Sequence, residues 1–304
     1  MPRFSIIIPC YNAEATLAQT LDSLRFQTEA DWEALIIDDG STDASRAIAA
    51  QAAAADDRFQ LLRNPGKGPA DARNLALSAA RGELIAFCDA DDLWAADKLA
   101  RMATLFADDS VDAAFARIAF FDTRGSRTLS TVPAGDLTVD TLLGENPVCT
   151  MSNVVIRHGV FVATGGFDSK LVHNEDLEWL IRLCACGFRV VGLDETLVHY
   201  RTSPTGLSSN LSAMRAGREA ALKTALRFGY APDARSEAVH LRYLARRALR
   251  TDAPVREALA LALAGVATSP RGFFSDLRRG GLTLAGALSA PLLPRPLRRS
   301  LFSN

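Results

Sequence analysis

Short apolar runs alternate with helical patterns along the first ninety residues. Between the runs, apolar side chains recur at helical spacing, as in Leu17, Leu21 and Leu24. Short unbroken apolar runs are typical of strands that are covered on both faces, as in a parallel sheet. The alternation predicts an α/β fold with a Rossmann-like, mostly parallel sheet and helices on both faces. The expected strands span residues 4–8, 35–37, 59–62 and 84–88.

Turn and capping residues mark the expected ends of the helices. Asn12 is placed to cap a helix over residues 13–27, because its short polar side chain suits an N-cap. Pro69 fits the first turn of a later helix, and Gly82 fits the position just after that helix.

Downstream of residue 94 the alternation continues with less regularity. Residues 123–150 are rich in Gly, Pro, Ser and Thr, and we expect them to line an acceptor site together with the polar loop 201–210. An apolar helix should begin near Glu175 and end at Gly187. Further strands are expected near residues 113–121, 154–156, 190–193 and 196–200.

The composition changes near residue 211 to Ala, Leu and Arg with helical periodicity. We therefore expect a first domain over residues 1–210 and a helical C-terminal extension over residues 211–304. Residues 271–304 contain six arginines and a single acid, Asp276. A basic amphipathic tail predicts peripheral binding to an anionic membrane surface. A helical appendage packed on the main domain, or a solvated tail, explains the pattern equally well.

The overall composition narrows the classes of partner. Lys and Arg number 34 against 35 Asp and Glu, so no global field favours nucleic acid. The five cysteines are odd in number, which suits reduced thiols in the cytoplasm. No apolar stretch approaches the ~20 residues of a membrane span, and the first run is too short for a signal peptide. We expect a cytoplasmic protein, peripheral at the inner face of the membrane.

An acidic cluster follows the strand expected at residues 84–88. Asp89, Asp91 and Asp92 occupy three of four successive positions, and carboxylates this close repel one another. A divalent cation relieves that repulsion, and oxygen ligands suit Mg²⁺ or Mn²⁺. An Asp-rich turn that caps the next helix is the alternative.

Three expected strands end in polar clusters, at residues 9–12, 38–40 and 89–91. Carboxyl ends of parallel strands share one edge of the sheet, where ligands bind. The segment GKGPAD at residues 66–71 fails the dinucleotide pattern, and the chain has no G-x-x-x-x-G-K-[ST] loop. A nucleotide bound at this edge would therefore need a metal for its phosphates.

Taken together, these residues resemble family 2 glycosyltransferases with the GT-A fold. The resemblance covers roughly the first 200 residues, and the final hundred carry no matching motif. The matching segments are SIIIPCYNAE (5–14), IIDDGSTD (36–43), ADARNLAL (70–77), FCDADDLW (87–94) and NEDLEWLIRL (174–183).

The resemblance implies inverting transfer of a sugar from a nucleotide diphosphate, usually UDP, onto an acceptor hydroxyl. His199 and Arg201 lie where some relatives place phosphate or metal contacts. By position, the resemblance implies that Pro9 and Tyr11 border the base and that Asp39 hydrogen-bonds the uracil ring. It implies that Arg73 helps to bind the nucleotide and that Asp89 contacts the ribose or the metal. It also implies that Asp91 ligates the metal and that Asp176 is the general base.

The carboxylates at residues 175–176 have a simpler explanation, since acids at a helix start complement its dipole. Processive synthases of this family have a region of several membrane spans and a QxxRW segment, and this chain shows neither. We therefore expect the transfer of a single sugar. The expected acceptor is a saccharide or a lipid-linked saccharide in surface polysaccharide assembly. Two alternatives are a sugar-1-phosphate nucleotidyltransferase, which normally has a Gly-rich loop where this chain reads PCYNAE, and a non-catalytic nucleotide-sugar-binding protein.

Overall fold

The computed structural model describes residues 1–122, 125–202, 211–250, 253–294 and 297. The chain divides into two compact units, the first made of Met1–Leu137 and Pro147–Thr202, the second of Thr138–Asn146 and Ser203–Asn304. The boundary expected at residue 210, and most of the polar loop 201–210, lie outside the described residues. The expected division at that residue stays a prediction.

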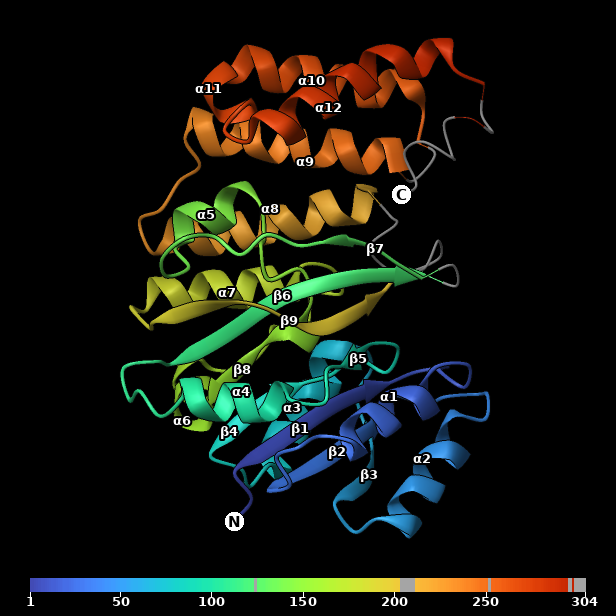
Figure 1. Cartoon of the computed structure of the whole chain (residues 1–304). Coiled ribbons are helices and arrows are strands. Elements are labelled where there is room, and N and C mark those ends of the chain that lie inside the picture. The colour runs from blue at the N-terminus through green and yellow to red at the C-terminus, as the bar shows by residue number, and fades with distance from the viewer. Residues whose placement is uncertain (123–124, 203–210, 251–252, 295–296, 298–304) are drawn as a thin grey trace. The chain divides into compact units, whose positions relative to one another are not determined.

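Nine strands of the first unit form one sheet within the described residues (Figure 1). Its parallel half has the order β3 (Phe59–Arg63), β2 (Trp32–Asp38), β1 (Phe4–Cys10) and β4 (Leu84–Phe87). Beyond β4 the sheet is mixed, with the order β8 (Val155–Arg157), β6 (Ala113–Asp122), β9 (Val190–Arg201) and β5 (Leu93–Trp94), and β7 (Gly125–Leu129) pairs with β6. The α/β fold expected from the alternation is confirmed.

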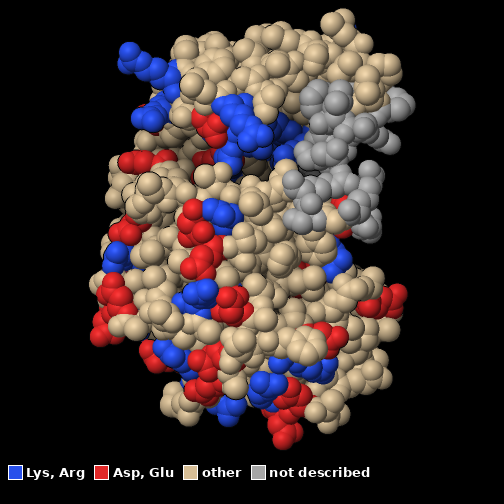
Figure 2. Space-filling view, in the orientation of Figure 1, with Lys and Arg blue, Asp and Glu red and all other residues tan. Residues whose placement is uncertain are grey.

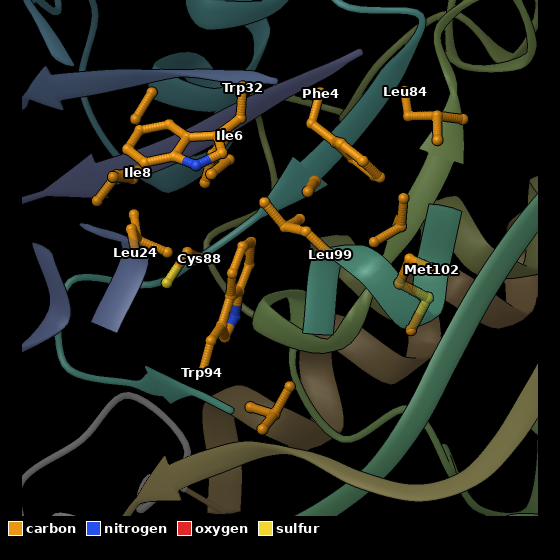
Figure 3. Close-up of a cluster of buried hydrophobic side chains, with 14 of the residues drawn as sticks. Phe4, Ile6, Ile8, Leu24, Trp32, Leu84, Cys88, Trp94, Leu99 and Met102 are labelled. Carbon is orange, nitrogen blue, oxygen red and sulfur yellow. The ribbon is translucent and has the colours of Figure 1, made fainter. Parts of the chain in front are cut away.

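Helices cover both faces of the parallel half. Alternate residues of β1 point to opposite faces, so Phe4, Ile6 and Ile8 join one apolar cluster while Ile7 is buried on the other side. Figure 3 shows Trp94 and Leu99 in the same cluster as Ile6 and Ile8. The helices of this unit are α1 (Leu17–Arg25), α2 (Ser45–Ala55), α3 (Pro69–Ala79), α4 (Lys98–Leu105), α6 (His158–Thr164) and α7 (Glu175–Ala185), with a 3₁₀ turn η1 (Met151–Asn153).

Two expected helix ends are wrong in detail. Asn12 does not cap α1, which begins at Leu17; it lies in the left-handed region and its Oδ1 accepts a hydrogen bond from the Thr42 amide. Gly82 does not close α3, which ends at Ala79. A Cβ on Gly82 would lie 2.4 Å from the Ser5 amide nitrogen, so glycine is needed there for close packing.

The second unit is helical. Its helices are α5 (Val139–Gly144), α8 (Leu211–Arg227), α9 (Ala234–Arg250), α10 (Val255–Thr268), α11 (Pro270–Phe273) and α12 (Leu277–Ser289), followed by η3 (Ala290–Leu292). Phe273 and Ala287 from the basic tail are buried in a core with Leu244 and Leu261. The described part of the tail therefore packs within this unit through one face. Among the described residues, none of the helices has the length and apolar character that crossing a membrane requires.

Candidate active site

The polar segments that follow β1 and β2 are tied together by hydrogen bonds. Cys10 and Asp38 lie opposite each other at the ends of these parallel strands. The Glu14 amide donates to Asp43, and the Glu14 carboxylate accepts from the Ala44 amide. Two segments that are thirty residues apart in sequence thus form one edge of the site.

Asp39 is held in a fixed orientation at this edge. Its amide donates to the Cys10 carbonyl at 2.8 Å. One carboxylate oxygen accepts from Asn64 Nδ2 at 2.6 Å, and the other accepts from the Gly68 amide at 2.8 Å. The side chain remains partly exposed, as does Pro9, and Tyr11 is largely exposed. A further donor from a ligand can therefore reach an oriented carboxylate.

Arg73 joins the acidic turn after β4 to the start of α7. Its guanidinium is buried and donates to Asp89 Oδ1 at 2.8 Å and to Glu175 Oε1 at 2.9 Å. Both terminal nitrogens are thus occupied by carboxylates, whereas the resemblance implies contact with a nucleotide. Nucleotide contact by Arg73 stays a prediction, and the geometry favours a positioning role.

Asp89 is held from its other side by the segment before β8. Its Oδ2 accepts from Thr150 Oγ1 at 3.0 Å, and its amide donates to Ser152 Oγ at 2.9 Å. Lys98 is buried beneath them and donates to the Ser152 carbonyl at 2.8 Å, and burial lowers its pKa to about 7. No motif marked Thr150, Ser152 or Lys98, because their roles depend on contacts distant in sequence.

Asp91 differs from its neighbours because its carboxylate has no hydrogen-bond partner among the other described residues. Burial, and then the charge of Asp89, raise its pKa to about 6. Asp92 is fully buried, and its Oδ1 accepts a hydrogen bond from the Arg201 amide at 3.0 Å. Burial raises the pKa of Asp92 well above its ordinary value.

The end of β9 lies beside this acidic turn. His199 pairs in register with Leu93, and Arg201 Nε donates to the Asp91 carbonyl at 2.9 Å. Of the two residues that the resemblance associates with phosphate or metal contacts, Arg201 thus contacts the acidic turn, while His199 lies on the strand paired with Leu93.

The donor set suits a hard divalent cation with few protein ligands. Among the described residues no group of three His, Cys, Asp or Glu side chains forms a closed metal cage. Mg²⁺ is typically held by one or two carboxylates together with water and substrate phosphates. Asp91, which has no hydrogen-bond partner in the described part of the chain, lies beside Asp89 and matches that demand.

Asp176 and Glu175 point to different surroundings at the start of α7. Glu175 is buried against Arg73, while Asp176 is partly exposed and its Oδ1 accepts from the Leu177 amide at 2.8 Å. Burial, and then the charge of Glu175, raise the pKa of Asp176 to about 7. A carboxylate with this pKa accepts protons effectively near neutral pH.

Comparisons with known proteins find relatives by sequence and by structure. The sequence profile described as Glycosyl transferase family 2 matches residues 5–164. The putative teichuronic acid biosynthesis glycosyltransferase TuaG of Bacillus subtilis is 31% identical over 69% of this chain and 82% of its own length. The Escherichia coli UDP-Glc:alpha-D-GlcNAc-diphosphoundecaprenol beta-1,3-glucosyltransferase WfgD is 32% identical over 68% and 79%.

Two solved structures share the fold at low sequence identity. Residues 1–349 of S. aureus TarS in complex with UDP-GlcNAc superpose with a TM-score of 0.64 at 17% identity, covering 95% of this chain and 92% of that one. The mannosyltransferase PcManGT of Pyrobaculum calidifontis, in complex with GDP-Man and Mn²⁺, gives 0.56 at 19% identity, covering 99% and 84%. These similarities confirm the GT-A fold expected from the sequence.

Proposed function

The chain belongs to glycosyl transferase family 2, and we propose that it is an inverting enzyme that moves a sugar from a UDP-sugar to an acceptor hydroxyl. The observation that carries the proposal is the Arg73 bridge, which fixes Asp89 and Glu175 and so brings the acidic turn next to Asp176. Donor-binding carboxylates and a proton acceptor are thereby assembled at one edge of the sheet.

In this proposal each side chain has one task. Asp39 accepts the uracil N3–H, with Pro9 and Tyr11 beside the base. Asp91 and Asp89 hold Mg²⁺ or Mn²⁺, which when bound stabilises negative charge on the departing diphosphate. Asp176 removes the proton of the acceptor hydroxyl from within ~3 Å. A single base suffices, because inversion needs no covalent glycosyl-enzyme intermediate.

The acceptor is proposed from the relatives. TuaG is named for teichuronic acid biosynthesis, and WfgD for transfer to a diphosphoundecaprenol-linked sugar. We infer that this chain likewise glycosylates a saccharide or a lipid-linked saccharide during surface polysaccharide assembly.

A thermal-shift screen of nucleotide sugars tests the donor assignment. A ligand that binds the native state stabilises it by RT ln(1 + [L]/Kd), so UDP-sugars with Mn²⁺ should raise the Tm most. GDP-Man is the informative competitor, because PcManGT was solved with it. A larger shift with GDP-Man would overturn the assignment of UDP but leave that of a nucleotide sugar intact.

Asp39 is expected to select uracil over other bases. Cytosine and adenine present a ring acceptor where uracil presents N3–H, and an unmatched polar pair costs on the order of 1–3 kcal/mol. UDP should therefore inhibit at least about tenfold more strongly than CDP or ADP, and Asp39→Asn should reduce that preference. Asp57→Asn, on an exposed turn, is the matched control. Equal inhibition of the native enzyme by all three nucleotides would contradict the role of Asp39.

The exposed face of α12 and η3 supports the peripheral membrane prediction. Four leucines there are at least half exposed, and Arg278 lies among them: Leu277, Leu282, Leu288 and Leu292. Truncation near residue 271 would remove Phe273 and Ala287 from the core, so surface substitutions make a cleaner test.

We expect the protein to sediment with anionic liposomes at low salt. The bound fraction should decrease as salt rises, because salt screens an attraction of about 1 kcal/mol per basic residue. Leu282→Ser with Leu288→Ser should weaken this binding, whereas Leu263→Ser, at a half-exposed position of α10, should not. If the native chain fails to bind at low salt, the packed-appendage alternative holds.

A further inference from the structure

Arginines of the second unit converge on one carboxylate. Arg242, Arg246 and Arg250 are four residues apart on α9 and therefore lie along one face of the helix. Figure 2 shows basic side chains gathered at the level of α9. Glu145, just after α5, lies 3.5 Å from Arg242, 3.9 Å from Arg246 and 3.7 Å from Arg279 of α12.

The arginine cluster consists of Arg242, Arg246, Arg250 and Arg279. Its positive charge exceeds the negative charge of the acidic residues that pair with it in the described part of the chain. Glu145 and Asp276 are the carboxylates that pair with it, and Asp276 pairs only with Arg279 among the described ion pairs. Among the residues that the structure describes, two acids thus face four guanidinium groups.

Hydrogen bonding within the cluster is incomplete. Arg246 forms an ion pair with Glu145 at 3.9 Å and no hydrogen bond with another described residue. Arg250 forms neither a hydrogen bond nor an ion pair with any described residue. Arg242 is 3% exposed, and its buried Nε lacks a partner in the described part of the chain. Its Nη1 donates to the Phe273 carbonyl and to Ser275 Oγ, and its Nη2 donates to Glu145, which fixes the guanidinium.

The guanidinium groups also repel one another. Burial lowers the pKa of Arg246 and of Arg250, and neighbouring arginines lower both further. Like charges four residues apart destabilise a helix, so the cluster costs stability when no anion is bound. Packing alone gives no reason to keep such an arrangement.

We propose that the arginine cluster binds a phosphate or diphosphate group. Guanidinium groups match phosphate oxygens in paired, charge-assisted hydrogen bonds, and a diphosphate carries enough charge to offset several of them. The cluster lies wholly within the second unit and shares no residue with the proposed transfer site. The inference therefore does not depend on the proposed function.

The group has two possible sources with the same chemistry, a lipid headgroup and a soluble phosphate. Arg279 lies on α12, the helix that also exposes Leu282 and Leu288. A lipid that carries a phosphate could therefore contact charge and apolar surface on one helix.

Titration of the full-length chain with inorganic pyrophosphate in EDTA, at constant ionic strength, tests the site without donor chemistry. We expect pyrophosphate to raise the Tm, and the double variant Arg246→Gln/Arg250→Gln to bind at least about tenfold more weakly. Without ligand that variant should have a Tm at least as high as that of the native chain, because two repelling charges are gone. Its thermal shift with UDP-sugar and Mn²⁺ should be unchanged. Arg235→Gln/Arg256→Gln removes two exposed charges outside the cluster and should respond like the native chain.

Vesicles distinguish the sources. Binding to phosphatidylcholine vesicles that contain phosphatidic acid, competed by pyrophosphate and lost in Arg246→Gln/Arg250→Gln, identifies a lipid headgroup. A pyrophosphate response without such binding identifies a soluble phosphate. An equal response of the cluster variant and the native chain, or an equal loss in both double variants, would overturn the proposal.

Discussion

Replacing Asp176 with Asn is expected to lower kcat by about 10²–10⁴-fold, the usual contribution of a general base, with little change in the Kd for UDP-sugar. The amide keeps the shape of the side chain and removes its proton acceptor. Steady-state kinetics and a binding titration on the same variant measure the two effects separately.

The pH profile adds a signature that a structural role would not give. The pKa of Asp176 is raised to about 7, so the required carboxylate form is lost as the pH falls through 7. kcat/KM, which reports the free enzyme, should fall about tenfold per pH unit below 7 and level off above it.

Glu175→Gln is the matched comparison, because it removes the neighbouring charge. Glu175 is engaged by Arg73 at 2.9 Å, so its loss should disturb Arg73 and Asp89 before any proton transfer. Near-normal kcat in Asp176→Asn together with an inactive Glu175→Gln enzyme would show that the base is the other carboxylate.

Asp91→Ala is expected to abolish activity and to remove the metal-dependent part of UDP binding while the fold persists. The metal-free variant should also gain on the order of 1 kcal/mol in free energy of unfolding above pH 6. The sign follows from the raised pKa, because folding disfavours the charged form of Asp91 and substitution removes that penalty.

Thermal shifts with UDP, with and without Mn²⁺, measure the loss at Asp91 independently of activity. Asp57→Ala, on an exposed turn, should retain the native response. Normal turnover in Asp91→Ala would contradict its assignment as a metal ligand.

The parallel half of the sheet was predictable because each strand there is a continuous apolar run with a helix after it. The mixed half was not, since β8 runs antiparallel to β4 and is about seventy residues further along the chain. The runs expected at 190–193 and 196–200 form one strand, β9, whose pairing with β6 shifts register near Arg117. Local periodicity does not encode such pairings.

The candidate site shows the same limit. Motifs predicted roles for Asp39, Asp89, Asp91 and Asp176, because these residues follow strand ends or begin a helix. The position of Arg73 between two carboxylates depends on a contact with a residue 102 positions away, which no local pattern reveals. The sequence likewise showed the arginine cluster only as a basic composition. The contacts of α9 and α12 with Glu145 depend on the tertiary fold.

Release of UDP tests the central claim most directly. The purified chain would be incubated with UDP-Glc or UDP-GlcNAc, Mn²⁺ and a lipid-linked saccharide extract, with Asp176→Asn as the matched control. A glycosyltransferase should release UDP only when acceptor is present, and the control at least about a hundredfold more slowly. A parallel incubation with UTP and a sugar-1-phosphate tests the nucleotidyltransferase alternative. Release of pyrophosphate there, or donor binding with no turnover for any acceptor, would contradict the proposed function.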